Sequence, residues 1–156
     1  MKQFNTVALG GTFDIIHNGH LSLLEKAFSI SSKVIIGLTG DELATKRGKR
    51  ILNPYSERRH RLEEMIVKHF PDTDFEISRL DNEFGPAVLE GKVEALVVSE
   101  ETKYQGSRLN ELRREKNLPE VEVIVVPMVL ADDGTRISTT RIKNNEITQE
   151  GKTTSS

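Results

Sequence analysis

Short runs of β-branched and other apolar residues alternate along the chain with segments whose apolar residues recur every three or four positions. The first pattern is typical of strands buried on both faces of a parallel sheet, and the second is typical of helices that cover such a sheet. The predicted strands are residues 7–9, 33–38, 74–80, 95–99 and 121–126.

Three helices are predicted between these strands. The first has a wide apolar face that includes Leu24 and Phe28. The second starts at the Asn-Pro pair that ends at Pro54 and stops before Pro71, and the third runs from about 107 to 116. Since connections between parallel strands are right-handed, we expect an α/β protein with a Rossmann-like, doubly wound, five-stranded parallel sheet.

The length of 156 residues suits one domain, which we place at residues 1–144, with a polar, weakly ordered tail at 145–156. A formal net charge of −2 removes the electrostatic case for general binding to nucleic acid or a membrane surface. No apolar run approaches the roughly 20 residues of a membrane helix, and no signal peptide is indicated, so a cytoplasmic protein is expected. The sequence does not decide the oligomeric state, and a monomer is the default expectation.

The absence of cysteine excludes disulfides, thiolate metal sites and a cysteine nucleophile. The most informative string for chemistry follows the first strand and reads Gly-Gly-Thr-Phe-Asp-Ile-Ile-His-Asn-Gly-His, residues 10–20. Gly10 and Gly11 permit a tight turn there, and the helix that follows is expected to direct free amides at a bound anion. The spacing fits neither a GxGxxG fingerprint nor a GxxxxGK[ST] loop.

His17 and His20 flank Gly19 at the start of this helix. Taken alone, such a pair is more often a hydrogen-bonded helix start than a reactive site. A metal site with Asp14 as third ligand is weaker still, because the sequence has no HExxH motif or second histidine cluster.

The complete string resembles the signature of the nucleotidyltransferase superfamily with the HxGH motif, in which both histidines contact the nucleotide phosphates. Residues 134–143 resemble the same superfamily's ISSTxIR motif, which opens a helix that holds the β- and γ-phosphates. The motif's last arginine is replaced here by Lys143, so either this lysine or the neighbouring Arg141 or Arg136 supplies the positive charge.

Two further segments narrow the resemblance to one family. The stretch Val-Val-Ser-Glu-Glu-Thr at 97–102 and the Asp-x-x-x-Gly-Pro element at 81–86 are similar to those of the archaeal and eukaryotic phosphopantetheine adenylyltransferases. This family joins 4′-phosphopantetheine to the AMP part of ATP and releases pyrophosphate. Dephospho-coenzyme A is then the expected product, and it or coenzyme A the expected inhibitor.

The resemblance also implies a role for each matching residue. His20 would donate a hydrogen bond to the α-phosphoryl group, His17 would bind the triphosphate, and Thr12 would hold the acceptor phosphate. Lys46 or Lys49 would bridge the two phosphate groups, and the spacing does not choose between them. Further nucleotide contacts are expected from Gly10, Gly11, Gly19, Arg58, Ser99, Glu100, Ser138, Thr139 and Thr140, and acceptor contacts from Phe13, Asp81, Gly85 and Pro86.

An acceptor phosphate is already dianionic near neutral pH, because its second pKa is about 6, so no catalytic base is required. We therefore expect direct in-line attack on the α-phosphorus without a covalent intermediate. Mg²⁺ is expected to arrive with ATP, held by phosphate oxygens and water, and no metal site on the protein is expected.

Three other functions stay open from sequence alone. The first is the same chemistry on nicotinamide mononucleotide, flavin mononucleotide or glycerol phosphate, because the HxGH and ISSTxIR strings concern the nucleotide rather than the acceptor. The second is a regulatory module that binds ATP without turnover. The third is a metal-dependent hydrolase built on Asp14, His17 and His20.

Overall fold

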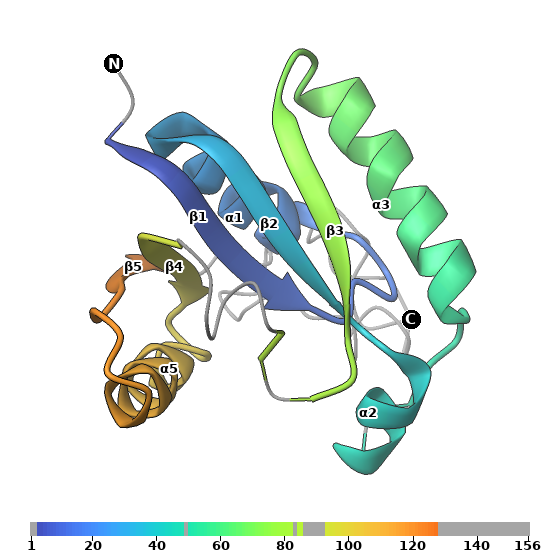
Figure 1. Ribbon diagram of the computed structural model, residues 1–156. Coiled ribbons are helices and arrows are strands. Elements are labelled where there is room, and N and C mark those ends of the chain that lie inside the picture. Colours follow the sequence, from blue (N-terminus) through green and yellow to red (C-terminus); the bar gives the residue numbers. More distant parts are fainter. Residues whose placement is uncertain (1–2, 49, 83, 86–92, 128–156) are drawn as a thin grey trace.

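The computed structural model describes residues 3–48, 50–82, 84–85 and 93–127. Within these ranges a five-stranded, fully parallel sheet has the order β3-β2-β1-β4-β5 (Figure 1). The strands are β1 (Phe4–Gly11), β2 (Ser31–Thr39), β3 (Asp74–Leu80), β4 (Ala95–Ser99) and β5 (Glu122–Val126). The predicted Rossmann-like α/β fold and all of the predicted strands are confirmed, although β1 and β2 extend further at both ends.

Helices cover both faces of this sheet. They are α1 (Asn18–Ile30), α2 (Asp41–Lys46), α3 (Tyr55–His69) and α5 (Tyr104–Glu115). Val7 and Leu9 of β1 belong to a large apolar cluster with α1 and α3, whereas Ala8 belongs to a smaller cluster with α5. Because alternate residues of a strand point to opposite faces, the continuous apolar run in β1 fills both cores.

Helix α2 was not predicted. Its six residues carry acidic side chains in the first turn and Lys46 in the last, which suits the helix dipole, but only Ala44 is buried. A helix with one apolar contact leaves no apolar period to detect. Lys46, one of the two candidate bridging lysines, therefore lies inside this helix, and α5 also starts three residues before the predicted position.

The carboxyl ends of the parallel strands all lie at one edge of the sheet, where α2 follows β2 (Figure 1). This edge carries the turn between β1 and α1, and ligands bind at such edges in open α/β sheets. In the described part of the chain, no helix has the length and hydropathy needed to cross a membrane.

Candidate functional site

The turn between β1 and α1 is built around a buried aromatic ring. Phe13 adopts a left-handed backbone conformation with a φ of 49°, and its side chain is 2% exposed. A Cβ atom on Gly11 would lie 3.0 Å from this ring. Gly10 and Gly11 are the last two residues of β1, and Gly11 permits the turn because it leaves room for the Phe13 ring that folds back over it.

The two histidines cap the first turn of α1. His17 is the N-cap, and its Nδ1 atom accepts a hydrogen bond from the Gly19 N–H at 3.1 Å. In return, the His17 N–H donates to Nδ1 of His20 at 3.2 Å. This is a reciprocal capping box in which imidazoles replace the usual hydroxyl and carboxylate. The amides of Gly19 and His20 are engaged within the helix start, so the expected free amides at these two positions are not found.

The capping bonds determine which ring nitrogen carries the proton. A neutral imidazole that accepts at Nδ1 is protonated at Nε2, so each neutral histidine here offers an Nε2–H donor. Burial lowers the pKa of His17 to about 4, which makes this ring neutral at pH 7. The two rings stack with centroids 3.9 Å apart, and Phe13 lies 4.7 Å from His20. Each ring of this stack that is neutral therefore carries its N–H at Nε2.

Gly19 is also explained by this arrangement. A Cβ atom at position 19 would lie 2.8 Å from Cε1 of His17. Any larger residue would push the imidazole out of its capping position, so the glycine between the histidines serves the geometry of His17.

Asp14 is buried, and its carboxylate is bonded to the loop that precedes α3. It accepts hydrogen bonds from the backbone N–H groups of Leu52 at 2.8 Å and Asn53 at 3.0 Å, and from the Asn53 side-chain amide at 3.1 Å. Among the described residues, no three histidine or acidic side chains group together as metal ligands. The carboxylate thus organises the backbone around the site.

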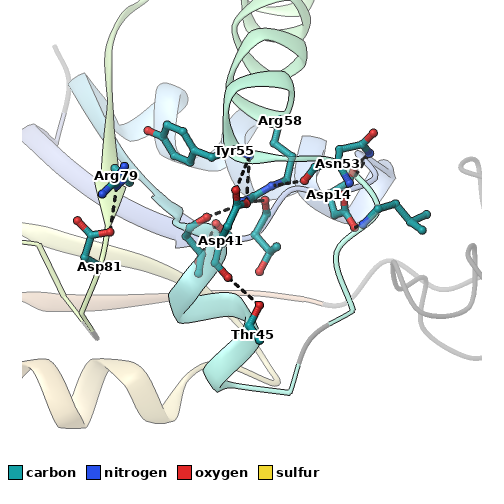
Figure 2. A network of polar contacts seen from close by, with 12 residues as sticks. Asp14, Asp41, Thr45, Asn53, Tyr55, Arg58, Arg79 and Asp81 are labelled. Atoms are coloured by element: carbon teal, nitrogen blue, oxygen red, sulfur yellow. Dashed lines mark hydrogen bonds and ion pairs between the residues drawn. The ribbon is translucent and has the colours of Figure 1, made fainter.

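Arg58 is fully buried at the centre of a polar network (Figure 2). One nitrogen of its guanidinium, Nη1, donates to the carbonyl oxygens of Thr12 at 2.9 Å and Thr39 at 2.7 Å. Its Nε donates to the Asn53 carbonyl at 3.0 Å, and Nη2 lies 2.6 Å from the Asp41 carboxylate. These contacts join four segments of the chain, and the nucleotide contact expected of Arg58 stays a prediction.

Sequence analysis did not identify Asp41 and Asn53 as partners of Arg58 and Asp14 in this network. Asn53 was seen only as part of a helix start, and Asp41 begins the helix that went unpredicted. The acidic pair that opens α2, directly after a strand, was the available signal for Asp41.

At the end of β4, the Thr102 hydroxyl fixes the position of Ser99. It accepts a hydrogen bond from the Ser99 N–H at 3.1 Å, and the two hydroxyls lie 3.0 Å apart. Ser99 is thereby held at the end of the strand that pairs with β1. Glu100 next to it is exposed and lies 3.8 Å from the Lys103 ammonium.

Of the expected acceptor residues, Phe13 lies against His20, whereas Asp81 lies at the other side of β2. Asp81 follows the edge strand β3 and accepts a hydrogen bond from Arg79 at 3.0 Å, and Gly85 is buried nearby in the chain. The structure therefore brings His17, Gly19 and His20 together at the start of α1, shortly after Gly10 and Gly11 at the end of β1, while Lys46 lies at the end of α2. Several predicted residues lie outside the described part of the chain: Lys49, Pro86, Ser138, Thr139, Thr140 and the basic residues 136, 141 and 143.

A match to a family model and the similarity to individual proteins both indicate the same family. Residues 8–145 match the cytidylyltransferase-like family. The phosphopantetheine adenylyltransferase of Methanothermobacter thermautotrophicus is 41% identical over 96% of this chain and 90% of its own length. The phosphopantetheine adenylyltransferase of Methanosarcina acetivorans is 43% identical, with 94% of each chain covered.

A solved structure, described as a protein with unknown function from Archaeoglobus fulgidus, superimposes with a TM-score of 0.71. It is 31% identical and covers 81% of this chain and 89% of its own. The chain belongs to the cytidylyltransferase-like family, and within it to the branch formed by the archaeal phosphopantetheine adenylyltransferases.

Proposed function

We propose that this protein transfers AMP from ATP to 4′-phosphopantetheine, giving dephospho-coenzyme A and pyrophosphate. The observation that carries the proposal is the capping box of His17 and His20, in which both rings accept at Nδ1 just after the central strand and therefore carry a proton at Nε2. The names of relatives that match over almost the whole chain support the acceptor. The other phosphate acceptors and a purely regulatory ATP-binding role are not favoured by these relatives.

The reaction needs charge stabilisation more than proton transfer. An oxygen of the acceptor phosphate attacks the α-phosphorus, the bond to the bridging oxygen of pyrophosphate breaks, and negative charge grows on the α-phosphoryl oxygens and the leaving group. His20 donates its Nε2–H to the α-phosphoryl group, and neutral His17 donates to the triphosphate. Fixed donors of this kind stabilise the transition state because they need no reorientation as the charge develops.

The other predicted site residues are assigned to the acceptor, the nucleotide and the pantetheine arm. Thr12 holds the acceptor phosphate, and Lys46 or Lys49 bridges the acceptor and the α-phosphate. Ser99 and Glu100 contact the nucleotide, with Ser138, Thr139 and Thr140 at its β- and γ-phosphates. Phe13, Asp81, Gly85 and Pro86 contact the pantetheine arm.

We also propose Mg²⁺ as the divalent ion of this reaction. It would enter with ATP, coordinated by phosphate oxygens and water, and would neutralise the charge on the triphosphate. The Asp14 carboxylate beside the histidines already accepts three hydrogen bonds from the loop before α3 and is a poor ligand. Inhibition by coenzyme A, a monomeric state and a cytoplasmic location stay predictions.

Pyrophosphate release with separate acceptors tests this function. The protein is given ATP and Mg²⁺ with 4′-phosphopantetheine, nicotinamide mononucleotide, flavin mononucleotide or glycerol phosphate. We expect release with 4′-phosphopantetheine only. His20→Ala should lower kcat by a factor of about 100 to 1,000, which is the usual effect of losing one such donor.

His60→Ala is the matched control, because this histidine lies on α3 with a side chain that is 70% exposed. It should retain the wild-type rate. Release with a different acceptor would refute the proposed substrate but keep the mechanism, whereas ATP binding without any release would favour the regulatory role.

A further inference from the structure

The chain between α2 and α3 carries a group of cations next to the proposed phosphate site. Lys46 ends α2, and Arg47 and Arg50 follow it, all with exposed side chains. Long cationic side chains on an exposed segment act on a bound phosphate only if the backbone holds them in reach. On each side of this segment the chain is bonded to a buried side chain, Arg58 on one side and Asp14 on the other.

The first anchor is the pair of Arg58 and Asp41. Asp41 begins α2, and its carboxylate accepts hydrogen bonds from Arg58 at 2.6 Å and from the Tyr55 N–H at 3.1 Å (Figure 2). Arg58 in turn binds the carbonyl oxygens of Thr12 and Thr39, at the ends of β1 and β2. The start of α2 is thereby tied to the turn that carries the histidines.

The second anchor is Asp14, which lies in that same turn. Its carboxylate accepts from the backbone of Leu52 and Asn53, where the cationic segment ends and α3 is about to begin. The Asn53 side chain returns a second bond to the Asp14 carbonyl at 3.1 Å, and the Asn53 carbonyl accepts from Arg58. The two anchors are therefore one connected network.

We propose that Asp14 and Arg58 are positioning residues: they tie the chain on both sides of the cationic segment, residues 46–50, to the β1–α1 turn, through Asp41 before the segment and through Leu52 and Asn53 after it. This inference rests on the proposed function and is drawn from the hydrogen bonds of Arg58 to the protein's own backbone. A buried guanidinium is retained because its fork of donors matches several oxygens at once, a geometry that the single ammonium of lysine does not reproduce. Loss of either anchor lets the segment drift, and a displacement of about 1 Å can cost a hundredfold in rate.

Limited digestion with trypsin reports on the anchoring without using the activity. The segment contains trypsin sites, so Asp14→Asn and Arg58→Lys should each speed cleavage within residues 46–50 by at least tenfold. Cleavage after Lys116, at the end of α5, should keep its wild-type rate. Asp74→Asn and Arg59→Lys are the matched controls, because both positions are exposed and Arg59 forms an ion pair with Glu63 on the surface of α3.

A kinetic cycle then tests whether the anchors act through the lysines. Asp14→Asn should lower kcat for pyrophosphate release by about 10- to 100-fold with a smaller change in the KM for ATP. In a Lys46→Ala/Lys49→Ala background the same substitution should cost less than about threefold, because interacting sites are not additive.

The possible failures are distinct. Unchanged cleavage within 46–50 in both anchor variants would overturn the proposal, as would equal losses of kcat with and without the two lysines. Faster cleavage at every site would mean general unfolding and would also refute it. If the wild-type protein releases no pyrophosphate with any acceptor, the proposed function fails, while the digestion still decides whether the anchors hold the segment.

Discussion

His17 combines two roles in one side chain. Its Nδ1 atom caps α1 through the Gly19 N–H, and the opposite nitrogen of the neutral ring remains a donor. A serine or aspartate would cap the helix equally well but would offer no donor on the far side of a planar ring. The residue therefore links the stability of the helix start to the chemistry of the site.

This link predicts a pH dependence of stability. Burial lowers the pKa of His17 to about 4, against 6.5 for an unperturbed histidine, so the unfolded chain takes up the proton first as the pH falls. The stabilisation is fully present above pH 6.5 and is lost as the pH falls towards 4. We expect the free energy of unfolding to be about 2 kcal/mol lower at pH 5 than at pH 8 from this group alone.

His17→Asn should remove this dependence, since the amide oxygen can still cap α1 but does not titrate in this range. Denaturant unfolding of both proteins at pH 5 and pH 8 measures the difference, with His60→Asn as the control for losing an exposed ring. Parallel pH profiles for wild type and His17→Asn would contradict the prediction.

At the residue scale, sequence analysis named the reactive side chains but not their bonds. The spacing of His17, Gly19 and His20 was sufficient to locate the turn. The partners of Arg58 were not accessible in this way, because three of them are carbonyl oxygens that any residue type provides. When a buried arginine binds backbone carbonyl oxygens, the residue types of its partners do not reveal the contact in the sequence.

At the scale of elements, apolar patterns were sufficient to predict helices and strands that are buried, but they did not predict elements that bury few residues. Strands β3 and β4 have the predicted bounds: residues 95–98 of β4 are all buried, and Ile77 of β3 lies in the large apolar cluster. Helix α2 buries only Ala44 and the first turn of α5 buries only Gly106, which leaves no apolar pattern in the sequence. The cationic segment, residues 46–50, likewise has no apolar pattern from which its structure could be predicted.

The packing of α5 on β5 depends on a single glycine. A Cβ atom at Gly106 would collide with the Cγ2 atom of Val123. Gly106→Ala should therefore lower the free energy of unfolding by about 1 to 3 kcal/mol, the usual cost of overpacking, although alanine is the better helix former.

A second substitution separates this collision from other effects. Val123→Ala in the Gly106→Ala background should recover most of the lost stability, as measured by denaturant unfolding, because it removes the atoms that collide. Additive losses in the double variant would show that the contact is not the cause.

At the scale of the molecule, the net charge is slightly negative, at −2, whereas hydrogen-bond donors and cations are concentrated at one edge of the sheet. A polyanion should therefore bind at this edge only. Because it binds the folded state, its binding free energy should raise the free energy of unfolding of the whole domain. At about 100 times its dissociation constant, a ligand that binds only the folded state adds about 2.7 kcal/mol. For a domain of this size, we expect ATP with Mg²⁺ to raise the melting temperature by about 5 to 10 °C.

Adenosine at the same concentration is the control, because it lacks the phosphates that the histidines and the cationic segment would bind. Differential scanning calorimetry should show a much smaller shift with adenosine. Equal shifts for the two ligands would mean that the phosphates contribute little to binding.

The network around Arg58 also bears on the order in which the protein is made. All of its members, from Thr12 to Arg58, lie in the first half of the chain, and β1, β2 and β3 pair in sequence order. A growing chain can therefore assemble this network before the rest has left the ribosome, since domains form during synthesis from the amino terminus. The other edge of β1 waits for β4, which starts at Ala95. Until then the central strand is an open, apolar edge, and synthesis that stalls between residues 80 and 95 would leave a nascent chain prone to aggregation.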